Sequence, residues 1–311
     1  MMKYKRIFIS GGAGVIGREL VDLLSKKGCS LLVGDLKPKP TDFSNDIIYK
    51  QGDLNLITQN EIEEFKPELF FHLAATFERT TETYNFWNEN YHNNIRLTHH
   101  LMELIKNIST IKRVVFASSY LVYNPKLYLF SAKQDNPVPL SESDEIKPRN
   151  LIGMAKLFNE MDIKFFDGFN EAGFSSLCVR IFRGYGQNGR DVISRWIRDI
   201  LNSKSIEVYR EDGIFDYIYS RDTAEGLLRL ADSEFQETVN LGSGKGRKVK
   251  DVLNILQKHF PQMIKKDTVS DIAYEASQSD NTLLKSIIGW EPEYDLERAI
   301  PEMIDYEKSH L

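Results

Sequence analysis

The stretch that decides the fold is Ser10-Gly11-Gly12-Ala13-Gly14-Val15-Ile16-Gly17. A short apolar run over Arg6–Ser10 comes before it and predicts a strand, and helical periodicity follows over Val15–Lys27. In this strand–turn–helix context Gly11 permits a tight turn, Gly14 lets a phosphate approach the backbone and Gly17 allows close helix packing. The stretch therefore predicts an α/β fold with a dinucleotide-binding turn.

The residues around this turn specify the expected cofactor. The first helical residues, Val15 and Ile16, complete the predicted contact, because a helix N-terminus faces the negative charge of a pyrophosphate. Asp35 ends the next strand, about 20 residues after the glycines, where a carboxylate binds the adenosine ribose. Since a carboxylate would repel a 2′-phosphate, the sequence predicts NAD. Lys37 and Lys39 follow closely and leave binding of NADP open.

Strands and helices alternate along the first half of the chain, which predicts a doubly wound parallel sheet of the Rossmann type. The second half is less regular and predicts a smaller α/β lobe. We expect an NAD-binding domain over residues 1–175 and a substrate-binding lobe over 176–311, with segments of the lobe partly rejoining the first domain. The main predicted strands are Ser30–Asp35, Ile47–Gly52, Leu69–Ala74, Arg113–Ser118 and Ser175–Phe182, and the long predicted helices are Phe86–Ile108 and Asn150–Ala172.

Composition narrows the class of protein. The 311 residues are 41% hydrophobic and 27% charged, with a net charge of −5, so no basic surface for nucleic acid is expected. No apolar run is long enough to span a bilayer, and the N-terminus does not resemble a secretory signal. The two cysteines, Cys29 and Cys178, lie far apart and predict free thiols, and no metal-binding motif occurs. These features predict a cytoplasmic protein without membrane or metal partners.

The glycine spacing resembles the extended short-chain dehydrogenases/reductases of the NAD-dependent epimerase/dehydratase family, which includes UDP-galactose 4-epimerase. The resemblance implies cofactor contacts at Asp53, Leu54, Leu73, Ala74, Ala75, Asn90, Ser118 and Lys156. Further segments occur in the family's order along nearly the whole chain. They are Gly52-Asp53-Leu54, His72-Leu73-Ala74-Ala75, Asn90, Ser118-Ser119-Tyr120-Leu121-Val122-Tyr123, Val179-Arg180-Ile181-Phe182, Asn240-Leu241-Gly242-Ser243-Gly244 and Gly289-Trp290-Glu291-Pro292.

One departure affects the chemistry that the resemblance implies. The family's catalytic Tyr lies four residues before its Lys on one helical face, and the matching residues here are Ile152 and Lys156. Isoleucine cannot transfer a proton, so either catalysis is lost or another group supplies the base. Ser119 matches the family's catalytic hydroxyl, and Tyr120 directly after it is the candidate base, with Tyr123 as an alternative.

The segment around Lys156 also resembles sugar-nucleotide 4,6-dehydratases that lack the Tyr. Those enzymes carry an acid after the catalytic hydroxyl, whereas Tyr120-Leu121 follows here and disfavours dehydration. Glu78 and Glu82, in the loop after Ala75, are candidate acids or solvated loop charges.

The resemblance implies a nucleotide-activated sugar as substrate, with hydride transfer at its C4. Arg180, Arg183 and Arg190 are candidate ligands of the diphosphate, since arginine binds phosphate through charge-assisted hydrogen bonds. Phe215 stands where the family has a further Arg. Two other hypotheses stay open: a non-catalytic NAD-binding sensor or scaffold, and a reductase of a non-sugar carbonyl.

The resemblance also implies a homodimer, or a tetramer built from dimers. Phe86–Ile108 and Asn150–Ala172 are expected to pair with their symmetry mates as a four-helix bundle. An apolar stripe on the first of these helices supports the expectation; it consists of Ile95, Leu97, Leu101, Leu104 and Ile105.

Overall fold

The chain divides into two compact units, and the first contains the glycine-rich turn. The computed structural model describes residues 2–77, 82–169, 173–268 and 271–310. Unit 1 comprises residues 1–124, 145–180 and 224–239, and unit 2 comprises 125–144, 181–223 and 240–311. The chain thus crosses between the two units several times. The reason is that Ser175–Ile181 joins the first sheet, whereas Val138–Leu140 pairs with Ser277–Ser279 in unit 2.

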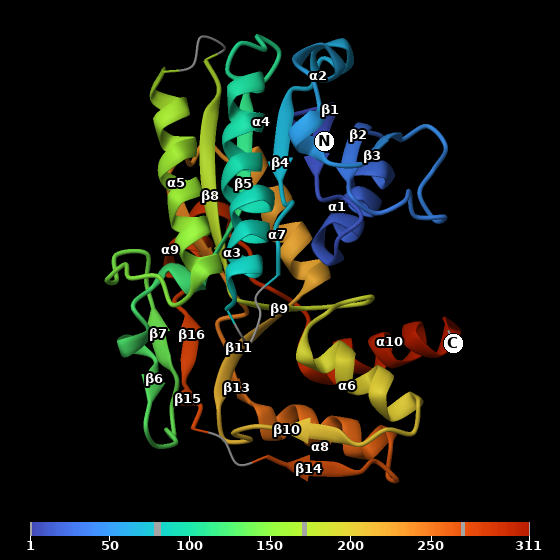
Figure 1. The fold of residues 1–311 in the computed structure, drawn as a ribbon, viewed down its shortest axis with the longest axis vertical. Helices are drawn as coiled ribbons and strands as arrows, with labels where there is room; N and C mark the ends of the chain where they lie inside the picture. Colours follow the sequence, from blue (N-terminus) through green and yellow to red (C-terminus); the bar gives the residue numbers. More distant parts are fainter. Residues whose placement is uncertain (1, 78–81, 170–172, 269–270, 311) are drawn as a thin grey trace. The chain divides into compact units, whose positions relative to one another are not determined.

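Seven strands form the sheet of unit 1 in the order β12-β8-β5-β4-β1-β2-β3 (Figure 1). β1 is parallel to both of its neighbours, β2 and β4, and β4 is parallel to β5. This arrangement confirms the predicted Rossmann-type fold, and the strand order reverses between β1 and β4, where such sheets bind ligands. The strands are β1 Arg6–Ser10, β2 Ser30–Asp35, β3 Ile48–Gln51, β4 Leu69–His72, β5 Arg113–Ser119, β8 Ser175–Ile181 and β12 Thr238–Leu241.

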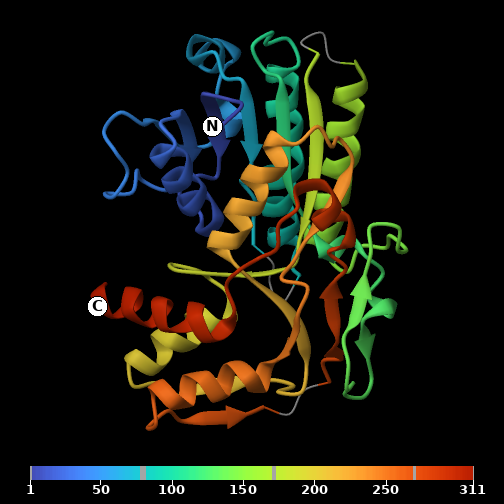
Figure 2. The same cartoon turned by 180° about the vertical axis from the view of Figure 1, so that it is seen from behind.

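Helices cover both faces of this sheet: Figure 1 shows α4 and α5 in front of β5 and β8, and Figure 2 shows α7 on the opposite side. The core under α4 and α5 joins helix residues such as Leu101 and Ile163 to sheet residues such as Phe70 and Val114. Among the described residues, no helix combines the length and the apolar character needed to cross a membrane. The helices are α1 Val15–Lys26, α2 Gln59–Phe65, α3 Tyr84–Asn90, α4 Leu97–Ile105, α5 Leu151–Phe169 and α7 Ser220–Asp232.

The prediction that the apolar stripe of the helix lies at an interface between subunits is wrong for most of its residues. Leu97, Leu101 and Ile105 are buried in the core of unit 1, and Leu104 packs against it, because the sheet lies on that side of α4. Other apolar side chains, on α3, on the residue that follows it and on α5, are exposed instead. They are Tyr84, Trp87, Tyr91, Met154, Phe158, Met161, Phe165 and Phe169.

A π-helix over Tyr91–Arg96 separates α3 from α4, where the sequence predicts one regular helix. Such wide turns are rare and occur frequently at functional sites. This one carries Asn94, whose side chain is buried.

Unit 2 is built around β11, which pairs with β9 in parallel and with β13 in antiparallel orientation. Its helices α6, α8 and α10 share an apolar core that includes Trp196, Leu256 and Ile300. Two short strands, β6 and β7, from residues 125–144 pair with β15 and β16. The elements are β6 Leu129–Phe130, β7 Val138–Leu140, β9 Arg183–Tyr185, α6 Val192–Leu201, β10 Ile206–Val208, β11 Ile214–Tyr219, β13 Gly246–Lys248, α8 Val249–His259, β14 Lys265–Asp267, β15 Tyr274–Glu275, β16 Ser277–Ser279, α9 Thr282–Ile288 and α10 Leu296–Ser309.

Candidate functional site

The glycine turn connects β1 to α1 in a shape that side chains would obstruct. Gly11 has a φ of +79°, and a Cβ at this position would lie 2.6 Å from the backbone nitrogen of Ala74. A Cβ at Gly17 would lie 2.3 Å from the carbonyl oxygen of Gly11. Both glycines are therefore required by close backbone contacts, as the sequence predicts.

The N-terminus of α1 is open to an anion. Its N-cap is Gly14, which supplies no side-chain hydrogen bond to the first turn. The amides that open a helix lack intrahelical acceptors, and the helix dipole adds partial positive charge there. Val15 and Ile16 begin the helix, so this end is suited to hold a pyrophosphate.

Asp35 is held rigidly beside the turn. One carboxylate oxygen accepts a hydrogen bond from the amide of Ala13 at 2.9 Å, and the other accepts from the amide of Lys37 at 2.9 Å. Both bonds come from the backbone, so they fix the carboxylate at the end of β2 without neutralising it.

Asp53 follows β3 and forms a second acidic position. Its carboxylate accepts from the amide of Asn55 at 2.9 Å and contacts His92 Nε2 at 2.8 Å. Burial alone would raise the pKa of Asp53, but the hydrogen bonds from Asn55 and His92 outweigh it and lower that pKa. The buried Leu54 packs against Gly34, where a Cβ would meet the leucine at 2.6 Å.

A buried hydrogen-bonded chain runs beneath the turn. His72 lies between Ser10 Oγ, 2.6 Å from Nδ1, and Thr98 Oγ1, 2.8 Å from Nε2. Because Thr98 donates to the carbonyl of Asn94 at 2.7 Å, its oxygen must accept from His72 Nε2–H, so Ser10 donates to Nδ1. Burial, reinforced by the charge of Lys156, lowers the pKa of His72 to about 3 and keeps the ring neutral.

The loop after β4 is fixed by the π-helix. Leu73 donates its amide to the carbonyl of Ser10 at 3.0 Å, and Thr76 donates its amide to Asn94 Oδ1 at 2.8 Å. Leu73 and Ala74 are half-buried and Ala75 is exposed, so this loop offers backbone at the carboxyl end of β4.

The predicted cofactor contact Asn90 is buried between helices. Its amide nitrogen donates to the carbonyl of Leu151 at 3.1 Å, and its oxygen accepts from Asn94 Nδ2. Sequence reasoning missed Asn94, because a π-helix has no clear sequence signal and only the geometry shows the role of this side chain.

The carboxyl end of β5 meets the first turns of α5. Lys156 is buried, and its Nζ donates to the carbonyl of Ala117 at 2.5 Å and lies 4.7 Å from the ring centroid of Phe116. Burial lowers the pKa of Lys156 to about 8, although the charge of Glu160 acts in the opposite direction. The ammonium is thus retained at neutral pH in a largely apolar setting.

Tyr120 lies close to this helix. A Cβ at Gly153 would be 2.4 Å from the carbonyl of Leu121, so the segment Tyr120–Val122 packs tightly against α5 beside Ile152. Tyr120 and Ile152 are both buried, while Ser119 is half-buried and accepts from the amide of Leu121 at 3.3 Å.

Arg180 has a partner inside unit 1. Its Nη2 and Nε donate to Glu160 at 2.8 and 3.1 Å, and its Nη1 donates to the phenol oxygen of Tyr123 at 3.2 Å. Burial alone would lower the pKa of Arg180, but the hydrogen bonds and the negative charge of Glu160 outweigh the effect of burial and raise that pKa. Nitrogen atoms of Arg180, for which the sequence predicts a diphosphate contact, are thus hydrogen-bonded to Glu160 and Tyr123.

Two of the remaining candidates belong to unit 2 and two precede α3 in unit 1. Arg183 is half-buried in unit 2 with its guanidinium 4.9 Å from the ring centroid of Phe215, and Arg190 is exposed. Glu82 accepts a hydrogen bond from the amide of Leu151 at 2.7 Å. Glu78 lies outside the described residues.

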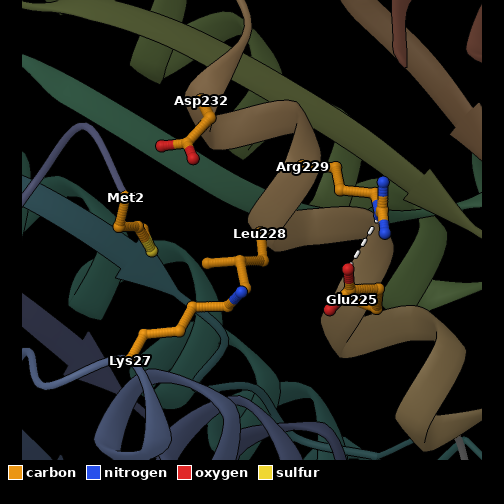
Figure 3. A pocket seen from close by; sticks show the side chains of 6 residues that line it. All are labelled: Met2, Lys27, Glu225, Leu228, Arg229 and Asp232. Carbon is orange, nitrogen blue, oxygen red and sulfur yellow. Dashed lines mark hydrogen bonds and ion pairs between the residues drawn. The ribbon is translucent and has the colours of Figure 1, made fainter. Parts of the chain in front are cut away.

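One cavity of unit 1 is not part of this site. It measures about 360 Å³ and lies where the N-terminal residues, the end of α1 and α7 meet (Figure 3). Its charged lining is already paired in part, because Arg229 binds Glu225 at 2.7 Å. The cavity is lined by Met2, Lys27, Glu225, Leu228, Arg229 and Asp232, and none of these residues belongs to the site described above.

A family model described as the NAD dependent epimerase/dehydratase family matches residues 7–242. The chain belongs to this family. A UDP-glucose 4-epimerase of Halalkalibacterium halodurans is 27% identical over 98% of this chain and 96% of that protein. A UDP-glucuronic acid decarboxylase of Arabidopsis thaliana is 25% identical over 96% of this chain and 88% of that protein. The solved structure of MoeE5 with UDP-glucuronic acid and NAD has a TM-score of 0.84 at 25% identity, covering 98% of this chain and 99% of that chain.

Membership of this NAD-dependent epimerase/dehydratase family confirms NAD as the predicted cofactor. The residues of the chain fit this cofactor. A Cβ at Gly11 would strike the backbone of Ala74, and the end of α1 without a side-chain cap suits a pyrophosphate. Asp35 ends β2 and binds the amide of Ala13 in the turn, and its carboxylate is the type of group that binds a ribose hydroxyl.

Proposed function

We propose that this family member is an enzyme acting on a nucleotide-activated sugar, with hydride transfer at C4 of the sugar. The observation that carries the proposal is the cluster at the carboxyl end of β5, where Ser119 and Tyr120 lie against the helix that holds Lys156. The relatives named for UDP-glucose and UDP-glucuronic acid support the class of substrate.

The proposed roles follow from the donors that the cluster offers. NAD, when bound, supplies the carbon that accepts and returns the hydride. One N–H of Lys156 is taken by Ala117, and the other two would hold a ribose hydroxyl. The hydroxyl of Ser119, whose oxygen already accepts from Leu121, would donate to the reacting sugar oxygen.

Tyr120 is the proposed acid and base. Its phenolate would accept the proton of the sugar hydroxyl during oxidation, and the resulting phenol would return that proton during reduction, a task that Ile152 cannot perform. The ammonium of Lys156 would favour the tyrosinate form by charge attraction. Tyr123 is less suited, since its phenol oxygen accepts from Arg180 and its side chain is fully buried.

For the diphosphate of the substrate we propose Arg183 and Arg190 of unit 2. A guanidinium forms charge-assisted hydrogen bonds with phosphate, and Arg183 stacks on Phe215, the residue that replaces the family's arginine.

We also propose that the exposed side chains of α3, the π-helix and α5 bind a second copy of the chain. Tyr84, Trp87 and Tyr91 stack on one another, and Met161 and Phe165 are exposed one turn apart on α5. Contiguous apolar surface of this kind marks an interaction site.

A non-catalytic sensor that binds NAD is the second candidate, and the buried Ile152 in place of a proton-transferring Tyr favours it.

Small molecules that copurify with the chain should be identified by mass spectrometry. The chain should then be incubated with NAD and a panel of sugar nucleotides while reduced-nicotinamide absorbance is followed. Reduction of NAD, or conversion of one sugar nucleotide to another, supports the enzyme. NAD binding without either change across the panel supports the sensor.

A further inference from the structure

Lys156 and Glu160 are bound to neighbouring residues of one strand. They are one turn apart on α5, so they lie on the same face of the helix. Lys156 Nζ donates to the carbonyl of Ala117, and the hydroxyl of Ser118 donates to Glu160 Oε1. The end of β5 therefore fixes the ammonium and the carboxylate relative to each other.

Arg180 fixes Glu160 from the other side. The guanidinium donates from two nitrogens to the two carboxylate oxygens, and the side chains of Arg180 and Glu160 are only 7% and 5% exposed. Such a fork leaves the carboxylate little freedom to rotate. Tyr123 accepts a further hydrogen bond from Arg180, so the guanidinium is held as well.

We propose that Glu160 is a positioning residue for Lys156: its carboxylate, held by Arg180 and Ser118, sustains the positive charge on the Lys156 ammonium. This inference rests on the proposed function, in which that charge holds the ribose and favours a tyrosinate. A buried ammonium loses the solvation of water, and a fixed carboxylate one helical turn away compensates part of that loss.

The other groups around Lys156 do not supply this compensation. Burial keeps His72 on β4 neutral by lowering its pKa, and burial raises the pKa of the Cys178 thiol on β8, which stays protonated. Arg180, also on β8, carries a positive charge and is directed at Glu160. The described surroundings thus place on Glu160 the negative charge that acts on Lys156.

The test is an NMR titration of the full chain with ¹³C-labelled lysine, in which the Lys156 signal is assigned by its loss in Lys156→Arg. Glu160→Gln should lower the titration midpoint of Lys156 by about one pH unit or more. Glu160→Asp, which keeps the charge, should restore most of the shift. A Lys156 that titrates in Glu160→Gln as it does in the unmodified chain would overturn the proposal.

Asp167→Asn is the matched control. Asp167 also lies on α5 and also binds β8, through the amide and hydroxyl of Ser176 at 3.1 and 2.8 Å. This variant should leave the Lys156 midpoint unchanged, and an equal shift here would show a general effect of the α5–β8 contact and overturn the proposal.

A second variant covers loss of folding in Glu160→Gln, which leaves the buried Arg180 unpaired. Glu160→Gln combined with Arg180→Gln removes both charges of the pair, and it should still lower the midpoint. The titration uses no substrate, so it separates the two proposals. A lowered midpoint in a chain that neither reduces NAD nor converts any sugar nucleotide would refute the proposed function and keep the role of Glu160.

Discussion

Asp35 accepts a hydrogen bond from the amide of Ala13 at 2.9 Å, which ties the carboxylate at the end of β2 to the glycine turn. A second backbone amide, that of Lys37, holds its other oxygen. These two hydrogen bonds fix the carboxylate, and we propose that it binds the adenosine ribose of NAD and repels a 2′-phosphate.

We expect the chain to bind NAD more tightly than NADP, and Asp35→Asn to narrow this preference. Loss of a hydrogen bond to a charged group corresponds to about 1.5–3 kcal/mol, so NAD affinity should fall roughly tenfold or more. Calorimetric titration of both proteins with both cofactors measures this. Tighter binding of NADP by the unmodified chain would refute the role of Asp35.

Gly11→Ala should destabilise unit 1 more than Gly28→Ala does. Both glycines have positive φ, +79° and +70°, which costs alanine about 1–2 kcal/mol. Only at Gly11 does the new Cβ strike backbone, that of Ala74, and such overpacking costs about 1–3 kcal/mol more. Urea unfolding of the two variants gives the comparison. Equal losses of stability would show that the backbone relaxes around the added methyl group.

Tyr120→Phe keeps the ring and removes the proposed proton carrier. Hydride transfer should fall by at least about tenfold, since general acid–base assistance contributes about 10²–10⁴-fold. NAD affinity should stay nearly unchanged. Single-turnover absorbance is the suitable measurement, because product release can limit steady-state turnover. An unaltered rate would assign the proton to Tyr123, to a glutamate of the loop after Ala75, or to water held by Ser119.

Hydride transfer in the unmodified chain should decline as the pH rises through about 8. The pKa of Lys156, lowered by burial to about 8, sets this limit, because the ammonium is present below that pH and absent above it. A pH profile of single-turnover rates locates the limb, and Lys156→Ala should lack it. A profile that stays flat up to the ordinary pKa of lysine would exclude a role for this charge.

Phe165→Glu should convert a dimer into monomers in sedimentation experiments at micromolar concentration. Phe165 is 59% exposed on α5, and a charge there would be buried unpaired at the proposed interface. Ile264→Glu is the control, because Ile264 is 63% exposed and belongs to unit 2, outside α3, the π-helix and α5. An unmodified chain that sediments as a monomer would exclude the interface.

Local sequence signals predicted the parts of the site that depend on backbone shape. The spacing of Gly11, Gly14 and Gly17 is sufficient to predict the turn, because a Cβ at each of these positions would approach neighbouring backbone atoms closely. The burial of Arg180 against Glu160 could not be predicted, since it depends on β8 lying beside α5, a contact between distant segments. The grouping of residues 125–144 with unit 2 likewise depends on distant segments, because these residues form strand pairs with residues 274–279.

The π-helix over Tyr91–Arg96 changes the rotational phase of the segment that contains it. In an uninterrupted α-helix, the exposed Tyr84, Trp87 and Tyr91 would share a face with Thr98 and Met102, yet these last two are buried. The wide turn acts as an inserted residue and rotates the following residues by about 100°. One continuous helical segment thereby exposes aromatic side chains in α3 and buries aliphatic side chains in α4. Deletion of one residue within Tyr91–Arg96 would convert the wide turn into regular α-helix and leave both faces in their present orientations, whereas an uninterrupted α-helix of all the same residues would force one face into the wrong environment.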